Sequence, residues 1–222
     1  MNRLDQTVTT RWPTGLAYSI IGGFLLIAVI AIIVARMVSP LVSDKALCDQ
    51  LADETFDLAN HPKSAEPRDI PKGRVMDALR SCERMANSNT DLRYVDQYGR
   101  ALEASEGSSN AEDNYHIAEA KYRVAADSGY GPAAIRLSLL LLRQPNPGIS
   151  VLKYIQQSFD YRKDVGNFLI GTRLNLSGNK SGNKFICRSA RLGYPLAQHL
   201  MDDGLAASHE CQDDAINTAY PP

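Results

Sequence analysis

Apolar residues follow two patterns along this chain: one long continuous run, and then spaced positions of helical period. Gly15 to Ala35 form a run of twenty-one residues without charge, most of them Ile, Leu, Val, Phe, Ala or Gly. Since a helix rises about 1.5 Å per residue, this run reaches the thickness of a bilayer's hydrocarbon core. The pattern predicts a transmembrane helix over residues 15–38, preceded by a short cytoplasmic N-terminus of residues 1–14.

A cleaved signal peptide is the alternative interpretation of this run. Signal peptides have an apolar core of about 7–15 residues, followed by a cleavage site of small residues. Here the run is longer, and Arg36, Met37 and Val38 follow it. We therefore expect an uncleaved signal anchor.

The charges that flank the run favour a cytoplasmic N-terminus only slightly. Arg3 and Arg11 precede the run, and Arg36 and Lys45 follow it, with acidic residues on both sides. All four cysteines come after the run, and an even number suits disulfides in an oxidising compartment. We expect a single-pass protein whose main body is periplasmic, most simply at a bacterial inner membrane.

Small residues recur along one side of the predicted membrane helix. They are Gly15, Ser19, Gly23, Ala31 and Ala35. Such a stripe lets another membrane helix approach closely. It indicates a helix partner within the bilayer, although Gly, Ala and Ser are also simply common in membrane helices.

The rest of the chain has the pattern of paired helices, and nothing in it favours strands. Residues 39–91 are expected to form one pair, with helical patterns at 46–58 and 74–86. Between them, residues 60–72 contain three prolines and are expected to be a loop. Residues 92–205 continue with helices separated by short breaks, and 206–222 are a C-terminal tail.

A set of positions recurs in this second part when 32 is added to each residue number. Each set contains a bulky residue, then a small pair, a turn position, and two positions on the next helix. The first set is Tyr122, Ala125, Ala126, Gly129, Ala133 and Leu137; the second is Tyr154, Gln157, Ser158, Tyr161, Val165 and Leu169; the third is Ile186, Ser189, Ala190, Gly193, Ala197 and Met201. The spacing predicts a helix, a tight glycine turn and a second helix, a unit that must stack on its neighbours.

The segment Ala118 to Leu142 resembles a Sel1-like repeat, a relative of the tetratricopeptide repeats. Tyr122, Ala125, Ala126, Gly129, Ala133 and Leu137 fill the places of the family pattern. Residues 94–104 resemble the first helix of a preceding repeat, whose second helix is then 110–127. The sequence departs from the pattern at Gln157, Ser158 and Tyr161, and residues 174–184 form a Gly- and Asn-rich loop longer than the family's usual turn.

The resemblance, which covers roughly residues 92–205, implies an α-solenoid. Taking this together with the apolar run, we expect an all-α protein: one transmembrane helix followed by an α-solenoid. The resemblance further implies an adaptor that binds another protein through its concave face and helix ends. Rings such as Tyr98, Tyr130, Tyr154 and Tyr194 are candidate anchors, whereas packing between repeats is the better interpretation for Tyr122 and Tyr154. The expected function is membrane-anchored protein–protein interaction, as an accessory subunit of a membrane complex. The alternative is a periplasmic enzyme or cell-wall-binding factor.

The four cysteines allow three disulfide connectivities. We favour Cys48–Cys82 and Cys187–Cys211, because each pair brackets neighbouring helices. Free or buried thiols and a metal site are the alternatives. Metal binding is disfavoured because the chain has no Cys-x-x-Cys, and His61, His116, His199 and His209 are not spaced as ligands with the cysteines.

Composition narrows the function further. The chain has 24 basic and 25 acidic residues and no basic tract, which argues against nucleic acid as a partner. No phosphate loop or nucleophile motif occurs. A polar cluster near the C-terminus, His199, Asp202, Asp203, His209 and Glu210, is read as a solvated face and not as an acid–base site. We expect no catalytic residue, cofactor or metal.

Overall fold

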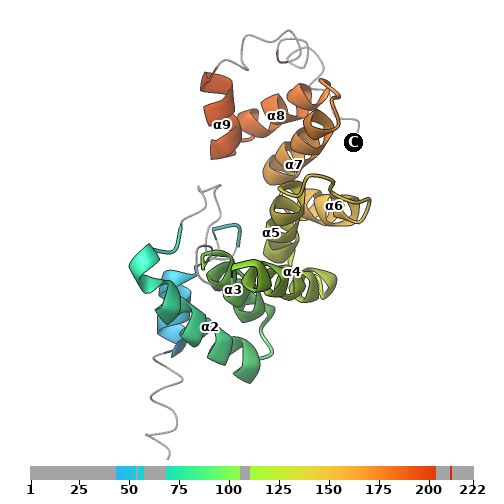
Figure 1. The fold of residues 1–222 in the computed structure, drawn as a ribbon. Helices are drawn as coiled ribbons and strands as arrows, with labels where there is room; N and C mark the ends of the chain where they lie inside the picture. The colour runs from blue at the N-terminus through green and yellow to red at the C-terminus, as the bar shows by residue number, and fades with distance from the viewer. Residues whose placement is uncertain (1–43, 54, 58–68, 106–110, 204–210, 212–222) are drawn as a thin grey trace, which may run out of the picture. The chain divides into compact units, whose positions relative to one another are not determined.

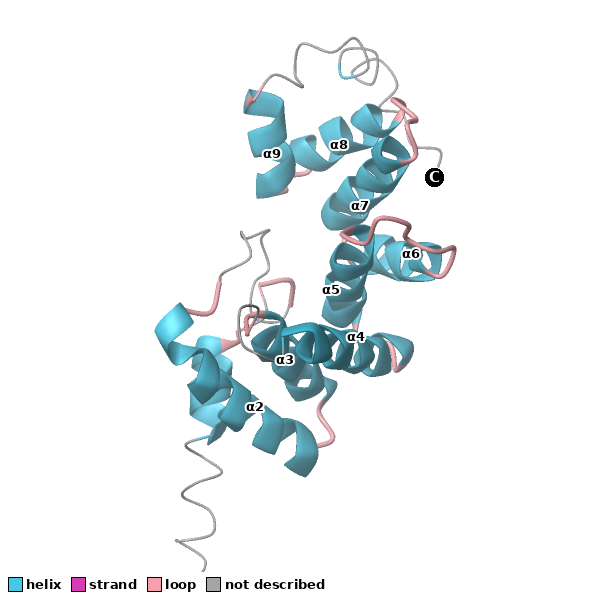
Figure 2. Ribbon diagram, viewed as in Figure 1, coloured by secondary structure: helices cyan, strands magenta, loops and turns pink. Residues whose placement is uncertain are grey.

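The computed structural model describes residues 44–53, 55–57, 69–105, 111–203 and 211, and these residues are helical with no strand among them (Figure 2). A first helical segment covers residues 44–51. It is followed by η1 (Lys72–Arg74), α2 (Val75–Ser88), α3 (Leu92–Glu103), α4 (Ala111–Asp127), α5 (Gly131–Leu142), α6 (Val151–Tyr161), α7 (Lys163–Leu176), α8 (Gly182–Arg191) and α9 (Pro195–Asp202). The all-α prediction is confirmed for this part of the chain.

Each helix from α2 to α8 packs against the helix that follows it, and α5 also contacts α7 (Figure 1). Helices that contact their neighbours in chain order are the arrangement expected of an α-solenoid. Each helix turns one apolar face to the preceding element and another to the following one. This is why α5, with neighbours on several sides, is apolar around most of its circumference.

Two apolar clusters form the interior. The first joins the helical segment 44–51, α2 and α3, through residues such as Cys48, Ala52, Cys82 and Tyr94. The second runs from Phe56 and the end of α3 to α9. It includes Tyr122, Leu137, Tyr154, Val165, Leu169, Ile186, Tyr194 and Ala197. Most of the positions of the sequence repeat therefore lie in this second cluster.

Two expected boundaries are wrong. The helix predicted over 46–58 ends at residue 51, and Phe56 is buried outside any helix. Arg100 of α3 donates to the backbone carbonyl of Asp53, which gives this carbonyl a partner where the chain has left the helix. The loop predicted over 174–184 is shorter, since α7 continues to Leu176 and α8 begins at Gly182.

The predicted membrane helix, its small-residue stripe and the N-terminal segment lie outside the described residues. Within the described residues, no helix is both long and apolar enough to cross a bilayer. All contacts given below belong to the part of the chain that begins at Asp44.

Candidate interaction surface

The junction between α4 and α5 is a glycine-stopped helix end. The backbone N–H of Gly129 donates to the carbonyl of Ala126 at 2.9 Å, and that of Tyr130 donates to Ala125 at 3.0 Å. Gly129 has φ +92°, a left-handed conformation that is costly for any residue with a Cβ. The pair of bonds is a Schellman motif, which gives partners to carbonyls that the helix end leaves open.

The junction between α8 and α9 repeats this geometry. Gly193 has φ +91° and donates to the carbonyl of Ala190 at 2.9 Å, and Tyr194 donates to Ser189 at 3.2 Å. The two junctions that the sequence identified as alike therefore share their hydrogen bonds and their backbone conformation. The following helices, α5 and α9, also begin with proline in their first turn.

The middle junction, between α6 and α7, is built differently. Tyr161 occupies the place of the glycine and is still helical, and a single extended residue, Arg162, separates the two helices. The Arg162 guanidinium is 4 % exposed and lies 2.7 Å from the carboxylate of Asp164. The Tyr161 ring lies over Gly131, where an added Cβ would come within 2.3 Å of the ring.

Despite this difference, the period of the sequence repeat survives in the structure. Helices α5, α7 and α9 begin at residues 131, 163 and 195. The equivalent residues Ala133, Val165 and Ala197 are all fully buried. The repeat predicted from the sequence is therefore a structural repeat of helix starts and buried positions.

Three of the repeat tyrosines are buried and cannot present their rings at the surface. Tyr122 donates its hydroxyl to Glu103 at 3.0 Å, and burial raises the pKa of this phenol well above its usual value. Tyr154 donates to Asp127 at 3.1 Å. Tyr194 packs edge-on against Phe168, with ring centroids 5.1 Å apart. Packing between helices, which the sequence favoured for Tyr122 and Tyr154, also holds for Tyr194, so its assignment as an exposed anchor is wrong.

The other two candidate anchors are half-buried. The Tyr98 hydroxyl lies 3.3 Å from Glu83, and Lys121 lies above the Tyr98 ring at 5.3 Å. Burial and the Glu83 carboxylate raise the pKa of Tyr98. The Tyr130 hydroxyl donates to Asp57 at 3.3 Å, so this ring is covered by the chain's own N-terminal region.

That covering segment consists of residues 52, 53 and 55–57, and we call it the strap. Phe56 is 1 % exposed and belongs to the second apolar cluster, although Ala52 belongs to the first. The guanidinium of Arg136 on α5 lies 4.9 Å above the Phe56 ring. The strap thus contacts α3 through Arg100 and the start of α5 through Tyr130 and Arg136.

Both cysteine pairs are disulfide-bonded, with the sequential connectivity that the sequence favoured. Cys48–Cys82 joins the helical segment 44–51 to α2, with the Cα atoms 4.9 Å apart. Cys187–Cys211 joins α8 to the C-terminal region, with the Cα atoms 5.5 Å apart. A bridge that closes a loop of 34 residues typically contributes about 2–4 kcal/mol.

Sequence reasoning missed a group of exposed apolar side chains on two neighbouring helices. On α4, Ile117 and Val124 are two helical turns apart along one face, and both are exposed. Ile149, just before α6, is 84 % exposed, and Leu152 on α6 is half exposed. Lys153 of α6 forms an exposed ion pair with Asp127 at the end of α4, at 2.7 Å. The sequence could have indicated this group, because these apolar residues do not occupy any of the repeat positions.

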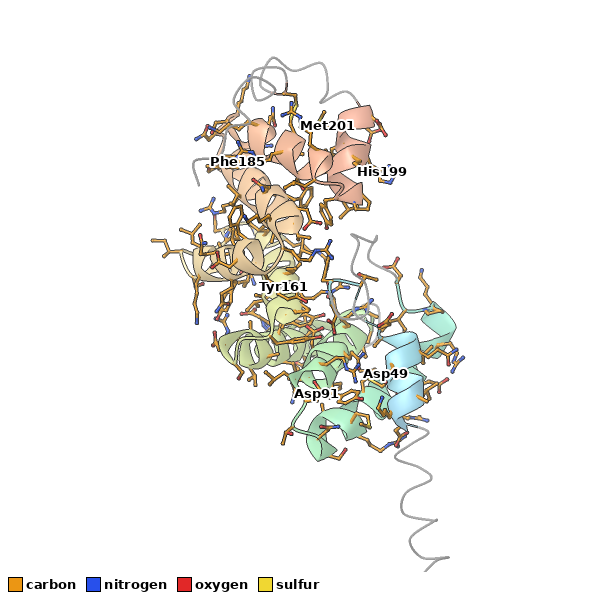
Figure 3. The ribbon with its side chains drawn as sticks, turned by 180° about the vertical axis from the view of Figure 1, so that it is seen from behind. Asp49, Asp91, Tyr161, Phe185, His199 and Met201 are labelled. Atoms are coloured by element: carbon orange, nitrogen blue, oxygen red, sulfur yellow. A yellow bond between two sulfur atoms is a disulfide. The ribbon has the colours of Figure 1, made fainter. Side chains whose placement is uncertain are left out.

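The predicted polar C-terminal cluster is described only in part. His199 and Asp202 on α9 and Asp203 just after it are exposed, and Figure 3 shows His199 at the outer side of this helix. His209 and Glu210 lie outside the described residues. Among the residues that the structure describes, no group of three or more His, Cys, Asp or Glu side chains is placed to hold a metal ion.

Comparisons with protein-family models, with curated proteins and with solved structures found no match to this chain.

Proposed function

We propose that the chain is a membrane-anchored adaptor that binds other proteins through its stacked helices, as an accessory subunit of a membrane complex. The observation that carries this proposal is the helix–turn–helix junction that recurs with the same hydrogen bonds at Gly129 and Gly193. Repeated helix pairs of this kind bury their apolar faces on one another and offer extended, rigid surfaces to partners. The Sel1-like resemblance supports the same class.

The exposed apolar side chains on α4 and α6 support protein binding. Four large apolar side chains are exposed to water here: Ile117, Val124, Ile149 and Leu152. Side chains of this kind contribute to association when a partner covers them, since burying apolar surface is favourable by about 25 cal/mol per Å².

The anchor and the compartment are proposed from the sequence and the disulfides together. The apolar run 15–35 is long enough for a bilayer crossing. Two disulfides that join helices suit an oxidising compartment, so we propose a periplasmic body. The small-residue stripe would then contact a membrane helix of the partner complex.

Co-purification after gentle detergent extraction tests the proposal. Gly15, Ser19 and Gly23 are changed together to Leu, and the matched control changes Ile21, Ala28 and Ile32, on the opposite side of the predicted helix, to Leu. We expect the stripe variant to lose the attached membrane proteins that the wild type and the control retain. Unchanged co-purification would contradict a subunit held by its membrane helix.

A second set of variants tests the exposed apolar side chains on α4 and α6. Val124→Glu and Leu152→Glu place charges on exposed apolar positions, and Met76→Glu, on α2, is the matched exposed control. We expect the first two to reduce the amount of co-purified protein more than the control does. If all three behave like the wild type, this surface does not bind the partner. Turnover or binding of peptidoglycan by the chain, with no protein partner recovered, would favour the enzyme or wall-binding alternative.

A further inference from the structure

The strap lies against the face formed by α3 and the start of α5 with the contacts of a bound peptide. It supplies one backbone carbonyl, one aromatic ring and one carboxylate. Arg100 donates to the carbonyl of Asp53, Arg136 stacks on the ring of Phe56, and Tyr130 donates to the carboxylate of Asp57. None of these contacts depends on the strap being helical.

The strap is attached to this face separately from the rest of the N-terminal region. The helical segment 44–51 is held to α2 by the Cys48–Cys82 bridge and packs in the first apolar cluster. Phe56, by contrast, belongs to the second cluster. Residues 53 and 55–57 of the strap can therefore leave the α3–α5 face while Ala52 stays in the first cluster.

The charges of this face are opposite to those of the strap. Arg100 and Arg136 present two guanidinium groups, and the strap brings the acidic residues Asp53 and Asp57. A guanidinium over an aromatic ring and a carboxylate near a hydroxyl donor select a segment with an aromatic residue followed by an acidic one.

From these contacts we propose that the α3–α5 face is a docking site for a non-helical acidic segment with an aromatic–acidic pair, and that the strap is its intramolecular occupant. This proposal rests on the adaptor function and names the chemistry of the partner segment. A partner would present an equivalent segment and displace the strap, while the disulfide retains the helix before it.

The test uses the full-length chain in detergent and a fluorescent peptide with the sequence of residues 51–58, Leu-Ala-Asp-Glu-Thr-Phe-Asp-Leu. Phe56→Ala empties the aromatic position of the strap. We expect this variant to bind the peptide about tenfold more tightly than the wild type, whose own strap competes; a tenfold change corresponds to loss of one ring contact. Fluorescence anisotropy gives the affinity, and near-UV circular dichroism with a non-reducing mass map confirms the fold.

Two further comparisons distinguish recognition of the aromatic ring from non-specific binding in the space that Phe56→Ala leaves. A peptide with its Phe replaced by Ala, and the double variant Phe56→Ala with Arg136→Gln, should each lose most of the binding. If Phe56→Ala does not fold, Asp57→Ala replaces it, since this change removes the carboxylate that accepts from the Tyr130 hydroxyl. Equal binding of both peptides, or equal affinity of the folded variant and the wild type, would overturn the proposal.

The peptide experiment and the co-purification experiment fail independently. The peptide result needs only the purified chain, so its failure leaves the adaptor function intact. If the stripe variant co-purifies the same proteins as the wild type, the adaptor proposal fails. The peptide affinity measured on the purified chain is still valid in that case.

Discussion

The two outer helix junctions and the middle junction solve the same geometric problem with different residues. At Gly129 and Gly193, a left-handed glycine stops the helix and the next residue forms an extended link. At the middle junction, helix α6 continues through Tyr161, the position of the glycine, and Arg162 is the whole connection. Both kinds of junction start the next helix in the same register.

Next to the short middle connection, α7 approaches α6 closely at one glycine. At Gly166 of α7, an added Cβ would lie 2.3 Å from the Cα of Phe159 on α6. The equivalent residue of the first junction, one repeat earlier, is Ala134, whose Cβ is accommodated. A glycine is therefore lost at the turn and gained where the helices touch. This comparison teaches that the repeat preserves helix positions and not turn residues.

The largest effect is expected from the ion pair that occupies the middle junction. Asp164→Ala removes the carboxylate that lies against the Arg162 guanidinium, which is 4 % exposed. Removing one partner of a buried ion pair typically costs about 3–5 kcal/mol, and we expect about 3 because Asp164 is itself slightly exposed. Urea unfolding measures the change. Asp160→Ala, at an exposed position on α6, is the control and should change the free energy of unfolding by less than about 0.5 kcal/mol. A cost of Asp164→Ala equal to that of the control would show that the pair does not hold the junction.

Gly166→Ala tests the close approach directly. Because the new Cβ meets backbone atoms of Phe159, the helices must separate, and overpacking of this kind costs about 1–3 kcal/mol. We expect a loss of about 2 kcal/mol, the middle of that range, in thermal or urea unfolding. The reciprocal change at the first junction, Ala134→Gly, should cost about 1 kcal/mol through helix propensity and lost burial. If Gly166→Ala were neutral, α6 and α7 would not be in the close contact described.

These junctions also show what the sequence reveals and what it hides. The sequence predicts the turns at Gly129 and Gly193, because a glycine after a helical pattern has a local cause, the left-handed conformation. It also predicts the buried positions 133, 165 and 197, because a small or apolar residue recurs there every 32 residues. It does not predict how the middle junction is held, because the Arg162–Asp164 pair and the approach of Gly166 to Phe159 depend on packing between helices.

The strap is hidden from sequence reasoning for the same reason. Leu47, Leu51 and Leu58 fit a helical period, so the sequence predicts one continuous helix to residue 58. The contacts that hold the chain outside a helix come from Arg100 and Arg136, which lie far along the chain on α3 and α5. The candidate tyrosines show the converse error: their ring chemistry suited surface anchors, but Tyr194 is buried against Phe168.

A moderate effect is expected where the outer junctions rely on glycine. Gly129→Ala and Gly193→Ala place a Cβ in a left-handed conformation, which costs about 1–2 kcal/mol. Nothing lies within 4 Å of either added Cβ, so the strain is in the backbone alone. Gly73→Ala is the control, since Gly73 also has open space and no positive φ. We expect the two junction variants to lose similar stability in urea unfolding and the control to lose little. If Gly129→Ala leaves the free energy of unfolding unchanged, the first junction does not need a left-handed glycine, and it could end its helix as α6 does at Tyr161.

The smallest effect concerns the charge contact that links the first junction to the middle repeat. The hydrogen bond from Lys153 on α6 lowers the pKa of Asp127 at the end of α4. Because this pKa is lower in the folded state, the contact stabilises the protein above the ordinary pKa of aspartate, about 3.9, and this stabilisation is lost as the pH falls through the folded value. Both side chains are exposed, so the effect is small and is screened by salt.

We expect Asp127→Asn to lose less stability than the wild type between about pH 5 and about pH 2, with the difference reduced at high salt, as followed by urea midpoints. Gln156 and Asp160, a neutral–acidic pair within α6, provide the comparison: Asp160→Asn should leave the acid dependence closer to that of the wild type. Parallel acid profiles for Asp127→Asn and the wild type would show that Lys153 does not couple α6 to the end of α4, and the middle repeat would then be joined to the first through apolar packing alone.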